Sequence, residues 1–168
     1  MTDRTPSGRA VKDRLSFHQG LHTAVAAGLA YWLTELLGFP GGYWAAISAI
    51  VVMQSEVGAT LVASRDRLAG TAMGAVIGWL AMDVWHGSIW VFAVAVLVVM
   101  MLCSALSFKN AGRLGGVTVA IIVLIPHSGP VWRLAVERFL EVSFGIVVSL
   151  LVAVAWSRVG NLMPRERA

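Results

Sequence analysis

The segment DRLAGTAMGAVIGWL, residues 66–80, returns 71 residues later as ERFLEVSFGIVVSLL, residues 137–151. Each segment opens with an acid–arginine pair, then becomes mostly apolar, and has a glycine at its ninth position. The match extends at the same offset in both directions, from Ala49, Ile50, Val52, Gly58 and Trp85 to Ala120, Ile121, Val123, Gly129 and Trp156. The chain is therefore predicted to contain two copies of one unit.

The composition predicts an integral membrane protein. Of the 168 residues, 58% are hydrophobic and 13% are charged, which is about half the charged fraction of a soluble domain. A soluble protein of this length could not bury so many apolar side chains. The basic residues lie in short groups between apolar segments rather than on one solvated face, so we expect a lipid bilayer as partner and no nucleic acid.

The apolar segments predict an all-α fold with six transmembrane helices. A helix needs roughly 20 residues to cross about 30 Å of hydrocarbon, and glycine- or proline-containing turns separate segments of about this length. The predicted spans are residues 18–37, 42–60, 66–84, 88–107, 112–127 and 131–157. Because each repeat, about 18–84 and 88–157, holds three crossings, the second copy is expected upside down, as an inverted 3+3 repeat.

Charge placement predicts the orientation. Of the 13 lysine and arginine residues, all but Arg133 and Arg138 fall on one side of the six spans. Positive residues favour the cytosolic side, so both termini are expected there. Residues 1–17 are then a cytosolic N-terminal arm, 18–158 a six-helix membrane domain and 159–168 a cytosolic tail.

Small and charged residues form a stripe in each repeat. In the third span Arg67 shares a helical face with Gly70, Gly74 and Gly78, and in the sixth span Arg138 shares one with Glu141, Gly145 and Ser149. Small residues let membrane helices approach closely, so these four glycines are predicted helix-packing positions. A bolder interpretation makes them the seam where the third and sixth spans cross, with an arginine at either end.

The two arginines have structural and functional interpretations. Arg67 can reach lipid phosphates along its own side chain, and Arg138 can join an ion-pair network with Glu137, Glu141 and Arg133. Burying a cation costs several kcal/mol unless it is paired or lines an aqueous path. The alternative is therefore that Arg67 and Arg138 attract an organic anion, one from each side of the membrane.

Three residues are candidates for carrying a proton. Glu141 is the carboxyl group expected to lie deepest in hydrocarbon, where burial and a neighbouring arginine act on its protonation in opposite directions. Glu56 and His127 lie at corresponding ends of the second and fifth spans, on opposite faces, where solvated helix-end residues are also common. No metal-binding spacing or nucleophile arrangement occurs, so we expect no metal, no cofactor and no enzymatic activity.

Two spans resemble a known family. Tyr43-Trp44-Ala45-Ala46 opens the second span, Gln54 lies near its end, and Arg67-Leu68-Ala69-Gly70-Thr71-Ala72-Met73-Gly74 opens the third. This pattern resembles the fusaric acid resistance and aromatic acid exporter family, to which the plant aluminium-activated malate transporters are related. The chain departs from it at Ser55-Glu56, where many members have a proline, and in having one membrane unit where larger members have two.

The resemblance implies a function and a site. Members are bacterial inner-membrane proteins linked to export of aromatic carboxylic acids and to tolerance of toxic ones. By resemblance, Arg67 and Arg138 contact the anion, Tyr43 and Trp44 lie near the substrate entrance, and Gln54 is a further substrate-binding position. A single small unit is expected to form a homo-oligomer, with a dimer as the first expectation.

Three functional hypotheses remain open from the sequence. The leading one is an exporter of organic acids, in which a carboxyl group couples transport to protons. A passive organic-anion channel shares the arginines but needs no such carboxyl group. A non-transporting membrane subunit of a larger complex has no evident use for the two arginines.

Overall fold

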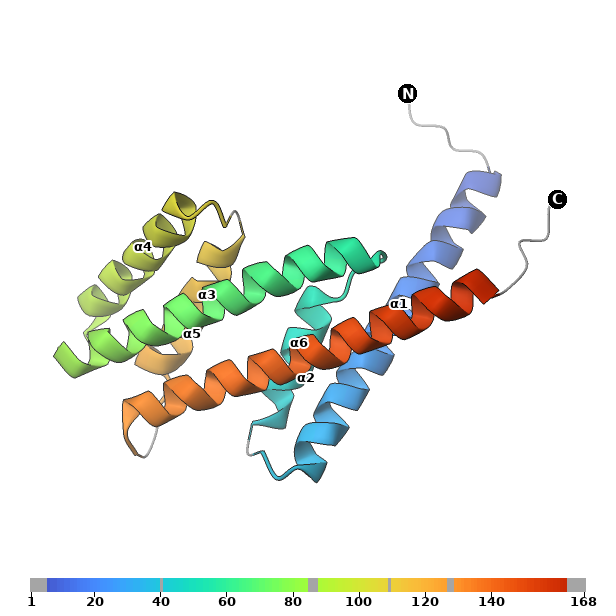
Figure 1. Ribbon diagram of the computed structural model, residues 1–168. Coiled ribbons are helices and arrows are strands. Elements are labelled where there is room, and N and C mark those ends of the chain that lie inside the picture. Colours follow the sequence, from blue (N-terminus) through green and yellow to red (C-terminus); the bar gives the residue numbers. More distant parts are fainter. Residues whose placement is uncertain (1–5, 40, 85–87, 109, 127–128, 163–168) are drawn as a thin grey trace.

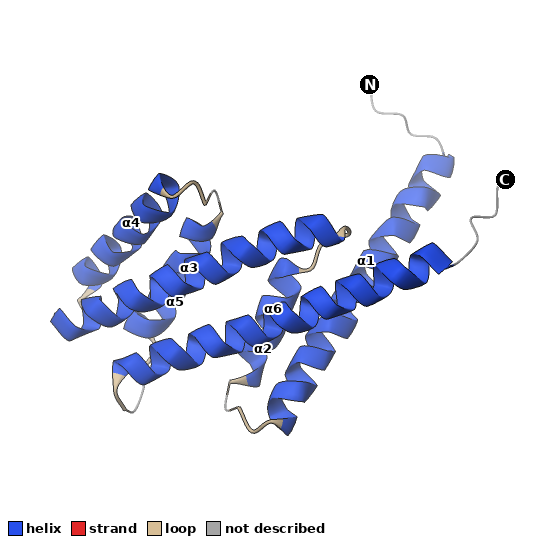
Figure 2. Ribbon diagram, in the orientation of Figure 1, coloured by secondary structure: helices blue, strands red, loops and turns tan. Residues whose placement is uncertain are grey.

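The computed structural model describes residues 6–39, 41–84, 88–108, 110–126 and 129–162, and every regular element within them is a helix. Figure 2 shows these helices joined by short loops. Their bounds are α1 Pro6–Leu36, α2 Gly42–Val52, α3 Val57–Val84, α4 Ile89–Ala105, α5 Ala111–Leu124 and α6 Val131–Leu162. The predicted all-α class is confirmed for the described residues.

Several helix boundaries differ from the predicted spans, most of all at the start of α1 and between α2 and α3. Helix α1 begins at Pro6 rather than at residue 18. Helix α2 ends at Val52, where Met53 takes an extended conformation, and α3 begins at Val57. The predicted continuous helix from residue 42 to 60 is therefore wrong. The side chain of Thr60 explains the break, because its hydroxyl accepts a hydrogen bond from the backbone N–H of Gln54 at 3.1 Å and donates one to the carbonyl of Glu56 at 3.1 Å.

The six helices have unequal lengths. At 1.5 Å per residue, α2 with 11 residues and α5 with 14 are about 17 Å and 21 Å long, less than the roughly 30 Å of a hydrocarbon core. Within the described residues, one helix combines the length and hydropathy of a complete span, over Val131–Arg158. The two short helices occupy equivalent places in the sequence repeat.

The long helices α3 and α6 form the centre of the molecule. Figure 1 shows them side by side and running in opposite directions, with α1 and α2 at one end and α4 and α5 at the other. Helices α1 and α2 pack on each other and on α6, whereas α4 and α5 pack on each other and on α3. The same packing scheme therefore occurs twice, and each half contributes its long helix to the other half's pair.

The turns that close these helix pairs are also alike. After α1, the N–H of Phe39 bonds the carbonyl of Thr34 and the N–H of Gly38 bonds that of Glu35. After α4, Phe108 bonds Cys103 and Ser107 bonds Ser104 in the same pattern. Both are Schellman motifs, which need a left-handed residue before the final one. Gly38 has φ of 73° and Ser107 has φ of 62°.

The core consists mainly of small residues, and the large apolar side chains point outward. Ala26, Ala30, Ala45 and Ala49 are fully buried in one cluster between α1, α2 and α6. By contrast, Trp90 is 78% exposed and Val84 is 77% exposed. A surface this apolar is suited to lipid rather than to water.

Candidate functional site

Glycines let α2 and α5 approach the two long helices closely. A Cβ atom on Gly70 would collide with the backbone carbonyl of Ala111, and one on Gly74 with that of Gly115. Gly78 faces Ile122, also on α5. On α6, a Cβ on Gly145 would collide with the backbone of Ala45 in α2.

These contacts correct the predicted partner of the glycine seam. The bolder interpretation had the stripes of α3 and α6 facing each other, but Gly70, Gly74 and Gly78 face α5 and Gly145 faces α2. The sequence could not identify the partner, because a stripe of small residues allows the close approach of any neighbouring helix. Helices α3 and α6 also contact each other, and Ala63 of α3 packs against a cluster formed by Val52, Val142 and Ile146.

The first polar group of the site is Arg67, which lies between α3 and α2. Its residue surface is 3% exposed. One terminal nitrogen, Nη2, donates a long hydrogen bond of 3.4 Å to Oγ of Ser48, and Nε has no hydrogen-bond partner. The preceding acid does not neutralise it, because Asp66 accepts a hydrogen bond of 3.2 Å from Asn110 on α5. Among the described residues, no carboxylate forms an ion pair with Arg67.

Two hydroxyl groups lie on the same face of α3 as Arg67. Ser64 and Thr71 are three residues before it and four after it, and both are buried. Neither Ser64 Oγ nor Thr71 Oγ1 has a hydrogen-bond partner among the residues that the structure describes. Buried polar groups in native proteins are nearly always hydrogen-bonded, so such a cluster is a place for water or a polar ligand.

The second polar group is the pair Arg138–Glu141 on α6. Arg138 Nη1 and Glu141 Oε2 are 2.9 Å apart, although the N–H is not directed at the oxygen and neither atom makes a hydrogen bond. The guanidinium carbon lies 5.0 Å from the ring centroid of Trp44 on α2, which is a cation–π distance. Glu141 is 2% exposed. This charged pair is thus almost inaccessible to solvent and lies against the N-terminal end of α2.

The carboxyl group of Glu141 lies against the N-terminus of α2. A Cβ on Gly41 would collide with this carboxyl group, so a larger residue there would displace the end of the Glu141 side chain. Gly41 caps α2 without any side-chain hydrogen bond. Because a helix N-terminus carries partial positive charge, it forms with Arg138 an environment that favours an anion, and the side chain of Glu141 occupies it.

Both arginines contact the same short helix. Arg67 reaches Ser48 and Arg138 reaches Trp44, and these contact points are four residues apart, or about 6 Å along α2. The sequence interpretation placed the two guanidinium groups at separate entrances. The structure instead brings both to α2, one turn apart.

The other predicted site residues lie elsewhere. Tyr43 is half exposed and its ring centroid lies 5.4 Å from that of Trp44. Gln54 lies in the turn after α2 and lines a separate cavity of about 440 Å³ with Asp66, Asn110 and Arg113. Glu56 is exposed in the same turn. His127 lies outside the described residues.

Sequence reasoning missed four residues of the site: Ser48, Ser64, Thr71 and Gly41. Ser64 and Thr71 carried a usable signal, since their spacing from Arg67 already places three polar groups on one face of an apolar helix. Gly41 lies in one of the glycine-containing turns between the predicted spans, and nothing in the sequence indicates its contact with Glu141. In the part of the chain that the structure describes, no group of three His, Cys, Asp or Glu side chains could hold a metal ion.

An all-α chain with a small-residue core and an outer surface of large apolar side chains belongs to the class of membrane proteins. More specifically, residues 29–152 match the family described as fusaric acid resistance protein-like, and the chain belongs to that family.

Relatives of this chain include two proteins of Escherichia coli strain K12. The uncharacterized transporter YdhK is 31% identical over 137 residues, which cover 76% of this chain and 20% of YdhK. The inner membrane protein YeeA is 28% identical over 142 residues, 82% of this chain and 40% of YeeA. An uncharacterized protein of Corynebacterium glutamicum is 27% identical over 84% of this chain and 37% of its own length. The chain thus spans between a fifth and two fifths of these relatives, and no solved structure matches it.

Proposed function

We propose that the chain is the membrane unit of an organic-acid transporter in the bacterial inner membrane. Aromatic carboxylic acids are the proposed substrates, and export is the proposed direction. The family and the transporter YdhK among the relatives support this class of function. In this proposal the two halves lie in the membrane as an inverted 3+3 repeat with both termini in the cytosol.

The observation that carries the proposal is the state of Arg67. A guanidinium group removed from water is costly unless an anion neutralises it, by several kcal/mol inside a membrane. Within the described part of the chain, Arg67 is buried without a carboxylate partner, and two hydroxyl groups on the same helix face also lack partners. The cost of burying this cation therefore supports a functional role for its charge. An organic carboxylate would accept from Arg67, Ser64 and Thr71 together.

The pair at α2 is proposed to couple this anion to a proton. With Glu141 charged, its carboxylate occupies the anion-favouring position between Arg138 and the start of α2. Protonation would remove that charge and release Arg138 to contact the substrate. The substrate anion then replaces the Glu141 carboxylate at Arg138 only when a proton is bound, which would link movement of the anion to movement of a proton. Glu56 and His127 remain weaker candidates, since Glu56 is exposed in a turn.

The short lengths of α2 and α5 also support a substrate site at α2. Helices that end within the membrane present their termini to substrates in several secondary transporters. Both α2 and α5 are too short to span hydrocarbon, and both arginines contact α2. We further propose that two copies of this unit work together as a homodimer.

Arg67→Met tests the proposal directly. Purified protein in liposomes would take up radiolabelled benzoate or salicylate under an imposed pH gradient. We expect Arg67→Met to lower uptake at least tenfold without lowering the unfolding temperature, because methionine fills the space and removes an unpaired buried cation. Arg133→Gln is the matched control, since Arg133 is exposed and pairs with Glu137 at 2.9 Å. Unchanged uptake by Arg67→Met contradicts the proposal.

A second arm separates the transporter from the anion channel. Glu141→Gln keeps the size of the side chain and removes its charge. In a coupled transporter this variant no longer responds to the pH gradient but still exchanges labelled for unlabelled acid. A channel instead gives stable single-channel currents in planar bilayers, which would show that Glu141 is not a coupling group.

A further inference from the structure

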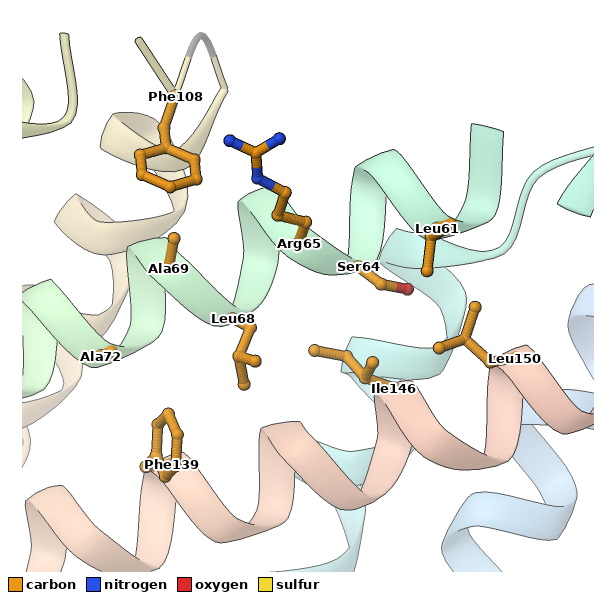
Figure 3. A pocket seen from close by; sticks show the side chains of 10 residues that line it. All are labelled: Leu61, Ser64, Arg65, Leu68, Ala69, Ala72, Phe108, Phe139, Ile146 and Leu150. Carbon is orange, nitrogen blue, oxygen red and sulfur yellow. The ribbon is translucent and has the colours of Figure 1, made fainter. Parts of the chain in front are cut away.

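The outer face of the α3–α6 pair carries two adjoining apolar cavities. The first, of about 500 Å³, is shown in Figure 3 and includes Leu61, Leu68, Ile146 and Leu150 in its lining. The second, of about 370 Å³, continues along the same helices. Ala72 and Phe139 line both cavities and mark the place where they meet.

The internal repeat relates the two cavities to each other. At the offset of 71 residues, Leu61 corresponds to Trp132, Ser64 to Ala135 and Leu68 to Phe139, and each of these residues lines its own cavity. The two cavities differ in charge at another equivalent pair. Arg65 lines the first cavity, and the equivalent residue of the second is Val136.

Arg65 is a fixed cation at the rim of the first cavity. Its guanidinium carbon lies 4.7 Å from the ring centroid of Phe108, in the turn after α4. Figure 3 shows Arg65 beside Phe108, while Leu68 and Ile146 point into the gap between α3 and α6. Arg65 is exposed, and no carboxylate among the described residues pairs with it.

We propose that this cavity binds an anionic phospholipid, with one acyl chain between α3 and α6 and its phosphate group on Arg65. The cavity opens at the apolar outer surface, where bilayer hydrocarbon is the available occupant. Its lining is apolar apart from the hydroxyl of Ser64 and the cation at the rim, which matches a ligand with a long apolar tail and an anionic head. The proposed orientation places Arg65 near the cytosolic leaflet, where its charge faces anionic headgroups. The second cavity has the same apolar form without a cation and should bind any lipid without regard to charge.

The test compares lipid selectivity rather than transport, so its result is independent of the proposed transport function. Protein purified in detergent would be exchanged into nanodiscs with equal amounts of phosphatidylglycerol and phosphatidylcholine of identical acyl chains. Lipids retained after stripping would be counted by native mass spectrometry. We expect one phosphatidylglycerol to be retained preferentially per chain. Arg65→Gln should lower that preference about fivefold, the effect of one cation near a membrane surface.

Two further variants complete the design. Leu68→Trp fills the cavity and should remove the retained lipid while leaving Arg65 in place. Arg133→Gln removes an exposed arginine away from both cavities and should change nothing. Circular dichroism and the unfolding temperature establish that each variant is folded. The proposal is overturned if Arg65→Gln retains phosphatidylglycerol as the unaltered chain does, or if Leu68→Trp leaves retention unchanged.

Discussion

At the scale of single residues, the site depends on the carboxyl group of Glu141, which occupies space that a side chain on Gly41 would fill. Glu141 is almost fully buried, and the space for its carboxyl group exists because residue 41 is glycine. Gly41 is also the N-cap of α2, so one position both precedes the helix and admits the carboxyl group. A methyl group added at residue 41 should therefore lower the stability of the protein.

We expect Gly41→Ala to lower the free energy of unfolding by about 1–3 kcal/mol, the usual cost of inserting a methyl group into filled space. Thermal or denaturant unfolding in detergent measures the change. In a Glu141→Ala background the same substitution should cost much less, because the colliding carboxyl group is gone. Gly28→Ala is the control, since nothing lies within 4 Å of a Cβ there and alanine favours a helix over glycine. Equal costs of Gly41→Ala in both backgrounds would refute the contact.

At the scale of helices, the sequence predicted the number of elements well and some boundaries poorly. Hydropathy cannot separate α2 from α3, because residues on both sides of the break are apolar. The break is set instead by Thr60, whose hydroxyl group bonds the backbone of the turn. By contrast, α5 ends before Pro126, because the residue before a proline is disfavoured in the helical conformation and Ile125 is extended. A hydrogen bond between one hydroxyl group and the backbone, as at Thr60, cannot be recognised from hydropathy.

The twin turns after α1 and α4 offer a matched pair of substitutions. Both need a left-handed residue, and Ser107 adopts that conformation at a steric cost that Gly38 avoids. We expect Ser107→Gly to raise the free energy of unfolding by up to about 1 kcal/mol and Gly38→Ala to lower it by about 1 kcal/mol. Unfolding in detergent measures both. Changes of the same sign at the two positions would contradict the equivalence of the turns.

At the scale of the whole molecule, the repeated sequence corresponds to a repeated packing scheme in which the halves interlock. The sequence indicated the repeat through Arg67 and Arg138, but not that each long helix packs on the other half's short helices. Glycine stripes identify a close approach and not its partner, which is why α5 and α2 were missed as the neighbours. The sequence also did not predict that both arginines contact α2, because these contacts depend on how the two halves are arranged in three dimensions.

The proposed orientation makes a prediction about the two twin turns. Figure 1 shows the turn after α1 at the lower edge of the molecule and the turn after α4 at the upper edge. Leu37 is 59% exposed and Leu106 is 57% exposed, so a cysteine at either position would be open to reagents. In a Cys103→Ala background, Leu37→Cys should react with a membrane-impermeant maleimide added outside spheroplasts. Leu106→Cys should react only in inside-out vesicles, because an inverted repeat places equivalent turns on opposite sides of the bilayer. Labelling of both cysteines from the same side would exclude the inverted arrangement, and with it a proton and substrate that reach α2 alternately from the two faces.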